Sequence, residues 1–212
     1  MNPRPNPAAL RIAGILLAAG ESRRMGRDKA LLPLGKRTFL EHLTAVLDGE
    51  VDPLVVVLGH HAAEIERQVR LPATAVLLRN PDYPQGQLSS LHVALRHLAD
   101  RVVDGALVCL VDHPAITKEV VRALIRSFAA SGASILLPTW NGRRGHPVLF
   151  AQRLFGELLT TPLDQGAREV VRRHSAEIAE VPVEEEGILW DVDRPEDYAA
   201  LRARWPALSR RS

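Results

Sequence analysis

The sequence predicts a single-domain α/β protein built on an open, doubly wound and mostly parallel sheet. Short apolar runs alternate with amphipathic segments along the first two thirds of the chain. Such runs are typical of strands that helices cover on both faces, as in a parallel sheet. The alternation of strands with helices favours the doubly wound arrangement. A chain of 212 residues is long enough to enclose one large core.

The predicted elements follow a regular order as far as residue 138. Strands are expected over five apolar runs, at residues 12–17, 54–58, 75–78, 106–111 and 134–137. Helices are expected over four amphipathic segments between them, at residues 38–47, 62–69, 89–98 and 118–130. In the last of these helices, apolar residues recur at the spacing of one helix face.

Beyond Pro138 the pattern becomes less regular. It predicts strands at residues 147–150 and 178–183, and helices at residues 153–159, 167–174 and 195–204. Pro195 suits the first position of the last helix. We expect one domain over residues 11–205, preceded by a flexible segment at residues 1–10 and followed by a basic tail at residues 206–212.

Composition excludes several functional classes. The 27 basic and 25 acidic residues give a formal net charge of +2, too small to indicate a nucleic-acid surface. No apolar run reaches the roughly 18 residues that cross a bilayer, and the N-terminus lacks a signal core. We therefore expect a cytoplasmic protein without nucleic-acid or membrane partners. The single cysteine, Cys109, excludes an internal disulfide and is expected in the core.

The stretch after the first predicted strand combines small and cationic residues. It contains Leu17, Ala18, Ala19, Gly20, Ser22, Arg23, Arg24, Gly26, Arg27 and Lys29. Small residues let a backbone approach a ligand closely, and successive N–H groups in such a loop bind anions. Arg24 and Lys29 add charge for a polyphosphate beyond the strand end, where open α/β sheets bind ligands. The spacing matches neither a P-loop nor a dinucleotide fingerprint, and a solvated basic loop is the alternative.

Acidic residues at two later positions indicate a magnesium site. Asp112 follows the apolar run at residues 106–111, and Asp191 and Asp193 precede the terminal helix. Mg²⁺ takes one or two protein carboxylates together with substrate phosphates. On a strand, Asp191 and Asp193 would face the same side, and a cation would offset their repulsion. The alternatives are a turn or capping role for Asp112 and helix capping by Asp193.

Further polar loops suit the binding of nucleotide and acceptor. Ser89 and Ser90, with Asn80 upstream, lie where a helix begins, and they could bind an anion or cap the helix. Cations, glycine and imidazole suited to a phosphorylated acceptor occur in two later loops, at Gly145, His146, Pro147 and Arg168. His60, His61 and His113 are not spaced as a zinc site with other ligands, so we expect them to be solvated loop residues.

Residues 17–29, LAAGESRRMGRDK, followed by Leu31-Leu32-Pro33, resemble the signature of the MobA-like NTP transferases. The resemblance covers residues 14–201 and implies the Rossmann-like nucleotidyltransferase fold. It also implies that residues 17–20 cradle the nucleotide, that Arg24 and Lys29 act on its phosphates, and that Asp112 binds the metal. The family often has glycine where this chain has Val111.

Three further strings are similar to the molybdopterin cytidylyltransferase branch of that family. They are the Gly-Gln and paired-serine segment at residues 86–90, Arg-Gly-His-Pro at residues 144–147, and Asp-Gln-Gly-Ala-Arg at residues 164–168. Members that use GTP tend to have glycine at the position of Ala19, so the resemblance favours CTP. It implies Mg²⁺ as cofactor, molybdopterin as acceptor and a molybdoenzyme that receives the product.

The expected reaction is direct displacement at the α-phosphorus of the NTP by an acceptor phosphate, with release of pyrophosphate. A phosphate monoester is largely anionic at pH 7, so the sequence need not supply a general base. Arg24, Lys29 and Asp112 are the expected catalytic residues. Transfer to a sugar phosphate or another phosphorylated molecule, a non-catalytic cofactor chaperone, and a structural protein of the same fold remain the alternatives.

Overall fold

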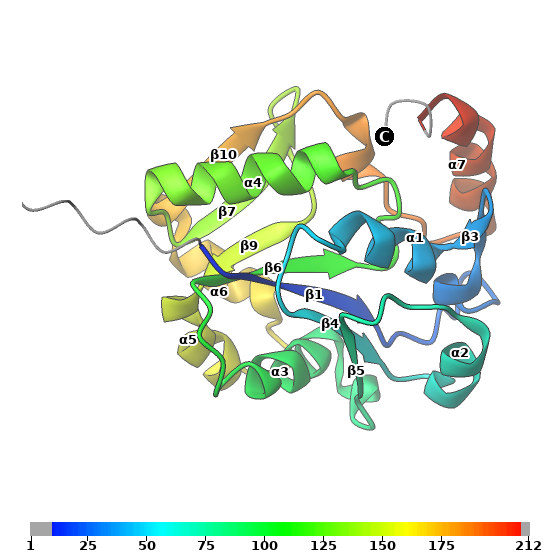
Figure 1. Ribbon diagram of the computed structural model, residues 1–212, viewed down its shortest axis with the longest axis horizontal. Coiled ribbons are helices and arrows are strands. Elements are labelled where there is room, and N and C mark those ends of the chain that lie inside the picture. The colour runs from blue at the N-terminus through cyan, green and yellow to red at the C-terminus, as the bar shows by residue number, and fades with distance from the viewer. Residues whose placement is uncertain (1–9, 209–212) are drawn as a thin grey trace, which may run out of the picture.

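The computed structural model describes residues 10–208 and shows a central sheet covered by helices on both faces (Figure 1). The main sheet contains β1 (Ile12–Ala18), β4 (Leu54–Leu58), β5 (Ala75–Arg79), β6 (Gly105–Leu110), β7 (Ile135–Trp140), β8 (Arg143–Arg144), β9 (Val148–Ala151) and β10 (Ile178–Pro182). A separate hairpin pairs β2 (Pro33–Leu34) with β3 (Arg37–Thr38).

The helices alternate with these strands along the chain. They are α1 (Phe39–Leu47), α2 (Ala62–Gln68), α3 (Gln87–His97), α4 (Lys118–Ser131), α5 (Phe155–Thr160), α6 (Ala167–Arg173) and α7 (Pro195–Leu208). Short 3₁₀ turns are η1 (Lys29–Leu31), η2 (Tyr83–Gln85), η3 (Gln152–Leu154), η4 (Ser175–Glu177) and η5 (Glu186–Leu189). Among the described helices, none has the length and apolar character that crossing a bilayer requires.

The sheet confirms the predicted fold class. Its strand order is β10-β7-β9-β6-β1-β4-β5, with β8 paired to β7. β1 lies between β6 and β4 and pairs in parallel with both. β9 runs antiparallel to its neighbours β6 and β7, and β10 pairs in parallel with β7. The carboxyl ends of β1, β4 and β6 therefore lie together at one edge, where open sheets bind ligands.

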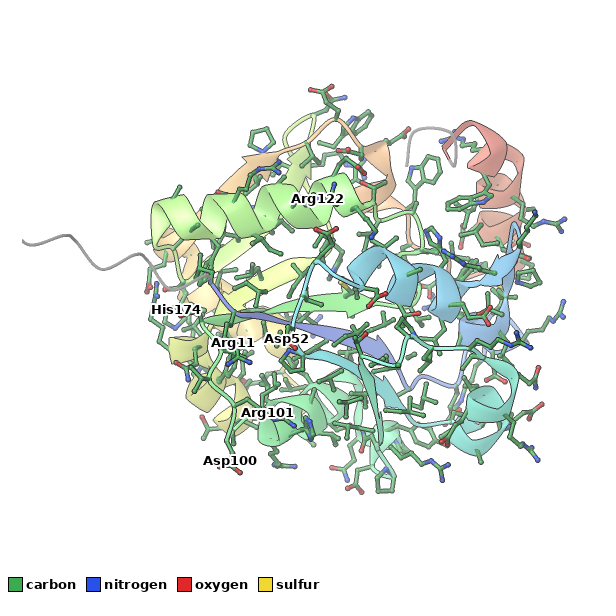
Figure 2. All side chains as sticks on the ribbon, in the orientation of Figure 1. Arg11, Asp52, Asp100, Arg101, Arg122 and His174 are labelled. Carbon is green, nitrogen blue, oxygen red and sulfur yellow. The ribbon has the colours of Figure 1, made fainter. Side chains whose placement is uncertain are left out.

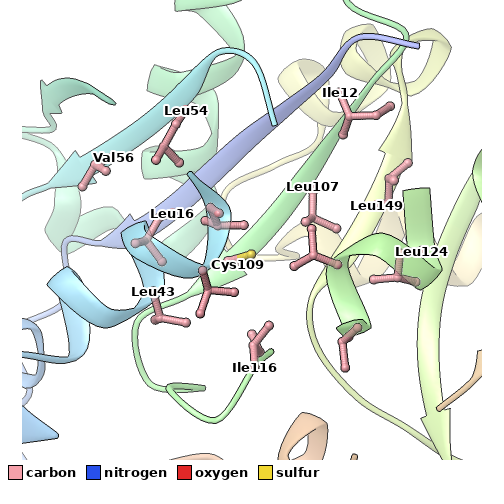
Figure 3. Close-up of a cluster of buried hydrophobic side chains, with 14 of the residues drawn as sticks. Ile12, Leu16, Leu43, Leu54, Val56, Leu107, Cys109, Ile116, Leu124 and Leu149 are labelled. Atoms are coloured by element: carbon pink, nitrogen blue, oxygen red, sulfur yellow. The ribbon is translucent and has the colours of Figure 1, made fainter. Parts of the chain in front are cut away.

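Alternating side chains of β1 build a core on each face of the sheet. Ile12 and Leu16 pack with α1, α2 and α4, in the cluster drawn in Figure 3. Ala13 and Ile15 point to the opposite face and pack with α3, α5 and α6. Cys109 lies in the first cluster with its side chain fully buried, which confirms the expectation for it, and burial raises the pKa of its thiol. A period of two along a strand produces this division.

A third apolar cluster holds the C-terminal part of the chain against the opening loop. Its buried members are Met25, Leu32, Leu34, Phe39, Ala115, Val192 and Leu201. They come from the loop after β1, the β2–β3 hairpin, helix α1, the segment after β6, the segment before α7 and helix α7 itself. This cluster brings residues 191–193 beside the carboxyl ends of β1 and β6, although they are distant in the sequence.

Several predicted boundaries differ from those observed. The prediction ended a strand at residue 137, but β7 continues through Pro138 to Trp140. β9 pairs only with Ile135 and Leu136 of β7, so Pro138 lies where the strand has lost that neighbour and tolerates a missing N–H. Helix α3 begins at Gln87, two residues before its prediction, and α7 continues to Leu208. The flexible segment predicted at residues 1–10 and the tail predicted at residues 206–212 lie largely outside the described residues.

Candidate functional site

The loop after β1 is anchored by one apolar residue between its cations. Met25 is 6% exposed and packs in the third cluster. The N–H groups of Met25 and Gly26 both donate to the carbonyl oxygen of Ser22, at 2.9 and 3.0 Å. The Ser22 hydroxyl also accepts a hydrogen bond from the backbone N–H of Lys29, at 3.1 Å. These contacts fold the loop back on itself, so that its cations lie beside the end of β1.

A cavity of about 300 Å³ opens at this edge of the sheet. It is lined by Leu17, Ala19, Gly20, Ser22, Arg23, Arg24, Lys29, Tyr83, Gly86, Gln87, Ser90, Leu110, Val111, Asp112 and Asp193. Among the described atoms, none lies within 4 Å of a Cβ placed on Gly20, so the backbone there is open to a ligand. Cations of the opening loop and carboxylates of two later segments therefore surround one space.

Lys29 is the central cation of this cavity. Its side chain is 10% exposed, and Nζ lies 2.5 Å from Asp193 Oδ1 and 3.4 Å from Asp112 Oδ2. Arg24 reaches the same carboxylate from the loop, with Nη2 2.5 Å from Asp193 Oδ2. Burial opposes ionisation of Asp193, but Lys29 and Arg24 outweigh it and hold its pKa below the usual value. Asp193 thus pairs with both of the cations that the sequence assigned to phosphate binding.

Asp112, His113 and Asp191 form a second group at the same edge. Each of the three residues offers one possible metal-ligand atom, and these atoms all lie within 4.8 Å of one another. Asp112 Oδ1 is buried without a hydrogen-bond partner among the described residues. Burial, followed by repulsion from Asp112 and Asp193, raises the pKa of Asp191. An orphaned carboxylate oxygen beside a destabilised carboxylate is an arrangement that a divalent cation would stabilise.

A backbone contact fixes this group. The N–H of Val192 donates to the carbonyl oxygen of Asp112 at 2.9 Å, and the Val192 side chain is buried in the third cluster. Asp191 and Asp193 flank Val192 but face different partners, namely the Asp112 group and the cations. Asp197, in the first turn of α7, accepts through Oδ2 from the N–H groups of Asp193 and Arg194, which precede the helix, at 3.1 and 2.8 Å. The Asp193 carboxylate instead pairs with Lys29 and Arg24, and no hydrogen bond from the first turn of α7 to it is found among the described residues.

The predicted Asn80 and serine pair forms a buried network beneath the cavity. Asn80 is 2% exposed, and its Nδ2 donates to Ser89 Oγ at 2.8 Å and to Ser90 Oγ at 2.9 Å. Ser89 Oγ also contacts the carbonyl oxygens of Asp82 and Gly86, at 3.0 and 2.8 Å. Ser90 lines the cavity, whereas Asn80 and Ser89 lie behind it. Asn80 therefore orients Ser90 rather than contacting the cavity with its own side chain.

A second cavity of about 390 Å³ adjoins the first, and both share Leu17, Gln87 and Leu110. Its other lining residues are Leu88, Leu91, Val108, His146, Val148, Phe150, Leu163, Asp164, Gln165, Gly166, Ala167, Arg168 and Val171. Most of these residues are apolar, and the polar side chains among them are those of Gln87, His146, Asp164, Gln165 and Arg168. His146 and Arg168, which the sequence assigned to the acceptor, therefore line the same cavity, and this cavity adjoins the one beside the loop after β1.

His146 packs against His113 with ring centroids 4.5 Å apart. Burial lowers the pKa of both imidazoles, and His113 helps to lower that of His146 to about 4. Nδ1 of each ring is buried without a hydrogen-bond partner among the described residues. Both rings are neutral at pH 7, so either can exchange a hydrogen bond with a ligand without adding charge.

Some predicted contact residues do not line either cavity. Ala18 packs into the first core cluster, because its position on β1 directs its side chain to that face. Gly145 is required for packing instead: a Cβ there would lie 2.5 Å from the carbonyl oxygen of Ile188. Pro147 is also absent from the described lining residues. These three residues support the site from outside.

The sequence prediction missed other members of the site. Tyr83 of η2, Gly86 after it and Gln87 at the start of α3 also line the first cavity. The histidine prediction was wrong for His113, which is 9% exposed and lies beside Asp112 and Asp191. His60 and His61 lie in the loop between β4 and α2, half-buried and exposed respectively, and Asp28 lies beside them. The adjacency of His113 to Asp112 was the available signal.

The fold and the cavities define an α/β protein in which a cationic loop, of the kind that binds phosphates, faces several carboxylates. Both lie at the carboxyl ends of parallel strands. Residues 14–178 match the family described as "MobA-like NTP transferase domain". The chain therefore belongs to the MobA-like NTP transferase family, and it is a nucleotidyltransferase by that membership.

Known proteins agree with this assignment. A protein of Mycolicibacterium paratuberculosis named "Probable molybdenum cofactor guanylyltransferase" is 32% identical over 198 residues, which cover 91% of this chain and 96% of the relative. The crystal structure of an Rv0371c homologue from Mycobacterium sp. strain JC1 has a TM-score of 0.80 and 32% identity, covering 94% of this chain and all (100%) of that one. Rv0371c of Mycobacterium tuberculosis, solved in complex with manganese, has a TM-score of 0.73 and 29% identity, covering 91% and 98% of the two chains.

Proposed function

We propose that this protein transfers CMP from CTP to the phosphate of molybdopterin, with a divalent metal, and releases pyrophosphate. The observation that carries the proposal is the convergence of Lys29, Arg24 and Asp112 around one cavity at the end of β1. Family membership supports the reaction class. The name of the Mycolicibacterium relative supports the molybdenum cofactor as the acceptor. A molybdoenzyme is the proposed recipient of the product.

The two adjoining cavities suit the two substrates. The triphosphate fits the first cavity, where loop N–H groups, Arg24 and Lys29 bind anionic oxygens. A fused-ring acceptor fits the mostly apolar second cavity, with Arg168 in its lining to hold a phosphate. Because both cavities are lined by Leu17 and Leu110, an acceptor phosphate in the second cavity would lie next to nucleotide phosphates in the first. Such positioning is a large part of catalysis in phosphoryl chemistry.

Charge repulsion between two polyanions is the main obstacle to this reaction. Phosphate oxygens bound in the first cavity would compete with Asp193 for Lys29 and Arg24, because all three side chains line that cavity. A phosphate monoester has a second pKa near 6, so the attacking oxygen is already largely deprotonated at pH 7. The residues therefore need to orient and neutralise the substrates, and they need not remove a proton.

The acidic group fits a divalent metal. Asp112 and Asp191 would hold it, since one carboxylate has an orphaned oxygen and the other is destabilised by its neighbours. When bound, the ion supplies positive charge that stabilises the developing negative charge on the phosphates. Two oxygen donors suit Mg²⁺, which we propose as the physiological ion, and the nearby His113 nitrogen also suits Mn²⁺. The manganese complex of Rv0371c supports a divalent ion of this kind.

The choice of nucleotide has two candidates. Ala19, which lines the first cavity, favours CTP through the resemblance of residues 17–20 to the cytidylyltransferase branch. GTP is favoured instead by the name of the Mycolicibacterium relative. Competition between equal concentrations of CTP and GTP, with molybdopterin as acceptor, separates them by the identity of the dinucleotide product. We expect CMP transfer to dominate, and dominant GMP transfer would assign the chain to the guanylyl branch.

Pyrophosphate release tests the reaction itself. The enzyme is incubated with NTP, Mg²⁺ and either molybdopterin or a sugar phosphate, and pyrophosphate is measured. We expect release with molybdopterin, and Asp112→Asn should lower the rate by about 10²–10³-fold, the loss typical of one electrostatic group in an active site. Circular dichroism of this variant should match wild type, because the change is isosteric. Turnover within about twofold of wild type would remove the metal role of Asp112.

Two other outcomes would replace the proposal. Pyrophosphate release with a sugar phosphate but not with molybdopterin would move the chain to the sugar-nucleotide alternative. Tight nucleotide binding without release for any acceptor would favour the cofactor chaperone.

A further inference from the structure

We propose that Asp28, His60 and His61 form a binding site for a transition-metal ion of the zinc class, separate from the acidic group at Asp112. Each of the three residues offers one ligand atom, and these atoms all lie within 4.8 Å of one another. Two imidazole nitrogens and one carboxylate oxygen suit Zn²⁺ and its first-row neighbours better than Mg²⁺. The site goes beyond the proposed function and does not depend on it.

The backbone between β4 and α2 brings the two imidazoles together. In an extended segment, successive side chains point to opposite sides. His61 instead adopts a left-handed conformation, with φ of 48° and ψ of 27°. The two rings consequently lie on one side, with centroids 3.7 Å apart and planes inclined by 35°. A left-handed conformation is uncommon for residues other than glycine, although asparagine, aspartate and histidine adopt it more often than the rest.

His60 is held by contacts that leave one ring nitrogen for a metal. Its backbone N–H donates to the carbonyl oxygen of Ala19 at 3.1 Å. Its Nδ1 lies 3.1 Å from the hydroxyl oxygen of Tyr83, so Nε2 is the atom left for coordination. In metal sites, a hydrogen bond to the second ring nitrogen fixes the orientation of a ligating histidine. Tyr83 takes this supporting role.

The ligand atoms of His61 and Asp28 are separated by nearly the distance expected for two ligands of one metal ion. Nδ1 of His61 is 3.0 Å from Oδ2 of Asp28. Two ligand atoms bound at about 2.0–2.1 Å to a tetrahedral ion lie about 3.3 Å apart, so a small movement admits the ion in place of the shared proton. The Asp28 side chain is 15% exposed and the His61 side chain 51% exposed. The site is therefore partly buried at Asp28 and open to water at His61.

The position of this site links it to the loop of the first cavity. Asp28 immediately precedes Lys29, and Tyr83 lines that cavity. An ion bound by Asp28, His60 and His61 joins the end of the loop after β1 to the connection between β4 and α2. Metal binding is thus expected to stabilise the loop conformation that presents Lys29.

Zinc titration of an untagged full-length chain tests the proposal. Asp112→Asn serves as the background, because it removes a carboxylate from the other group. Isothermal titration calorimetry with ZnSO₄ is expected to show one ion per chain. Adding His61→Asn should weaken this binding at least about tenfold, and asparagine tolerates the left-handed conformation. Asp28→Asn, added instead of His61→Asn, should weaken it similarly.

His97→Asn in the same background is the matched control. His97 lies in the last turn of α3, outside both of the clusters found among the described residues, so its loss should leave zinc binding unchanged. Circular dichroism without zinc confirms that each variant is folded. A background chain that binds no zinc overturns the proposal. So does a His61→Asn or Asp28→Asn variant that is folded and binds zinc as tightly as the background.

Discussion

At the scale of single residues, Lys29 has the most constrained environment in the site. It is the one lysine among the buried polar residues of the described chain, and it faces two carboxylates that come from distant segments. A buried cation between two carboxylates compensates their repulsion before substrate binds. Lys29 therefore holds the two carboxylates together, and in the proposed reaction it would also bind phosphate.

Replacing Lys29 by methionine separates charge from packing. Methionine is similar in length and apolar, so the fold should persist, but Asp112 and Asp193 then lack their buried counter-charge. We expect kcat/KM for pyrophosphate release to fall by about 10²–10³-fold. Arg27→Gln is the control, since Arg27 is exposed and outside the lining of the first cavity. If Lys29→Met stays within about twofold of wild type, the phosphate role of Lys29 is wrong.

At the scale of elements, the connection between β8 and β9 is fixed by close backbone contacts. The N–H of Gly145 donates to the carbonyl oxygen of Pro138 at 2.9 Å, and that of His146 donates to Ile188 at 3.0 Å. A Cβ on Gly145 would lie 2.5 Å from the same Ile188 oxygen. The small size of Gly145 lets this connection approach η5, which sets the position of His146 in the second cavity.

Gly145→Ala and Gly156→Ala are a matched pair with opposite expected effects. At Gly145, the clash with backbone should destabilise the fold by about 1–3 kcal/mol. At Gly156 in helix α5, none of the described atoms lies within 4 Å of the added Cβ, so alanine should stabilise by about 0.5–1 kcal/mol. Denaturant unfolding of both variants measures the two signs. Equal stabilities would contradict the close packing at Gly145.

A histidine also joins two elements at the other end of the molecule. His174, labelled in Figure 2, follows α6 and has Nδ1 2.8 Å from Glu177 and Nε2 2.6 Å from Glu157 of α5. Arg173 Nη1 lies 3.3 Å from the same Glu157 carboxylate. Glu177 in turn accepts a hydrogen bond from the Ser134 hydroxyl, at the start of β7. Glu177 and Glu157 raise the pKa of His174.

This raised pKa predicts the direction of a pH effect. A histidine whose pKa is higher in the folded chain contributes stability that is fully present below its unfolded pKa, near 6.5, and is lost as pH rises through the folded value. Wild type should therefore exceed His174→Gln in melting temperature by more at pH 6 than at pH 8. Thermal unfolding of both proteins at the two pH values checks this. A difference that is constant or larger at pH 8 would contradict the ion-pair assignment.

At the scale of the whole molecule, most of the fold could be predicted from the sequence. The apolar runs of β1, β4 and β6 are continuous because helices cover both faces, and this is a local signal. The antiparallel direction of β9 could not be predicted from a local apolar run. The direction of a strand depends on the strands that pair with it in the folded sheet. Pro138 misled for the same reason: proline disfavours a strand only where a paired N–H is required.

Site residues that directly follow strands could be predicted from the sequence. Contacts between residues that are distant in the sequence could not, because only the folded chain brings those residues together. Lys29, Arg24 and Asp112 follow strands in the sequence, and the structure brings them to one cavity. The pairing of Asp193 with Lys29, and of His113 with Asp191, depends on the third apolar cluster. The side chain of Ala18, a residue that the resemblance assigned to the nucleotide, lies in the core because the period of the strand directs it there.

The central claim is that a nucleoside triphosphate binds over the loop after β1, with help from Lys29 and a divalent metal. Equilibrium titration of CTP and of GTP, each with Mg²⁺ and with EDTA in its place, tests this most directly. We predict saturable binding of at least one nucleotide that weakens about tenfold or more in EDTA and also in Lys29→Met. Absence of binding for both nucleotides, or an affinity that neither EDTA nor Lys29→Met changes, would contradict the claim.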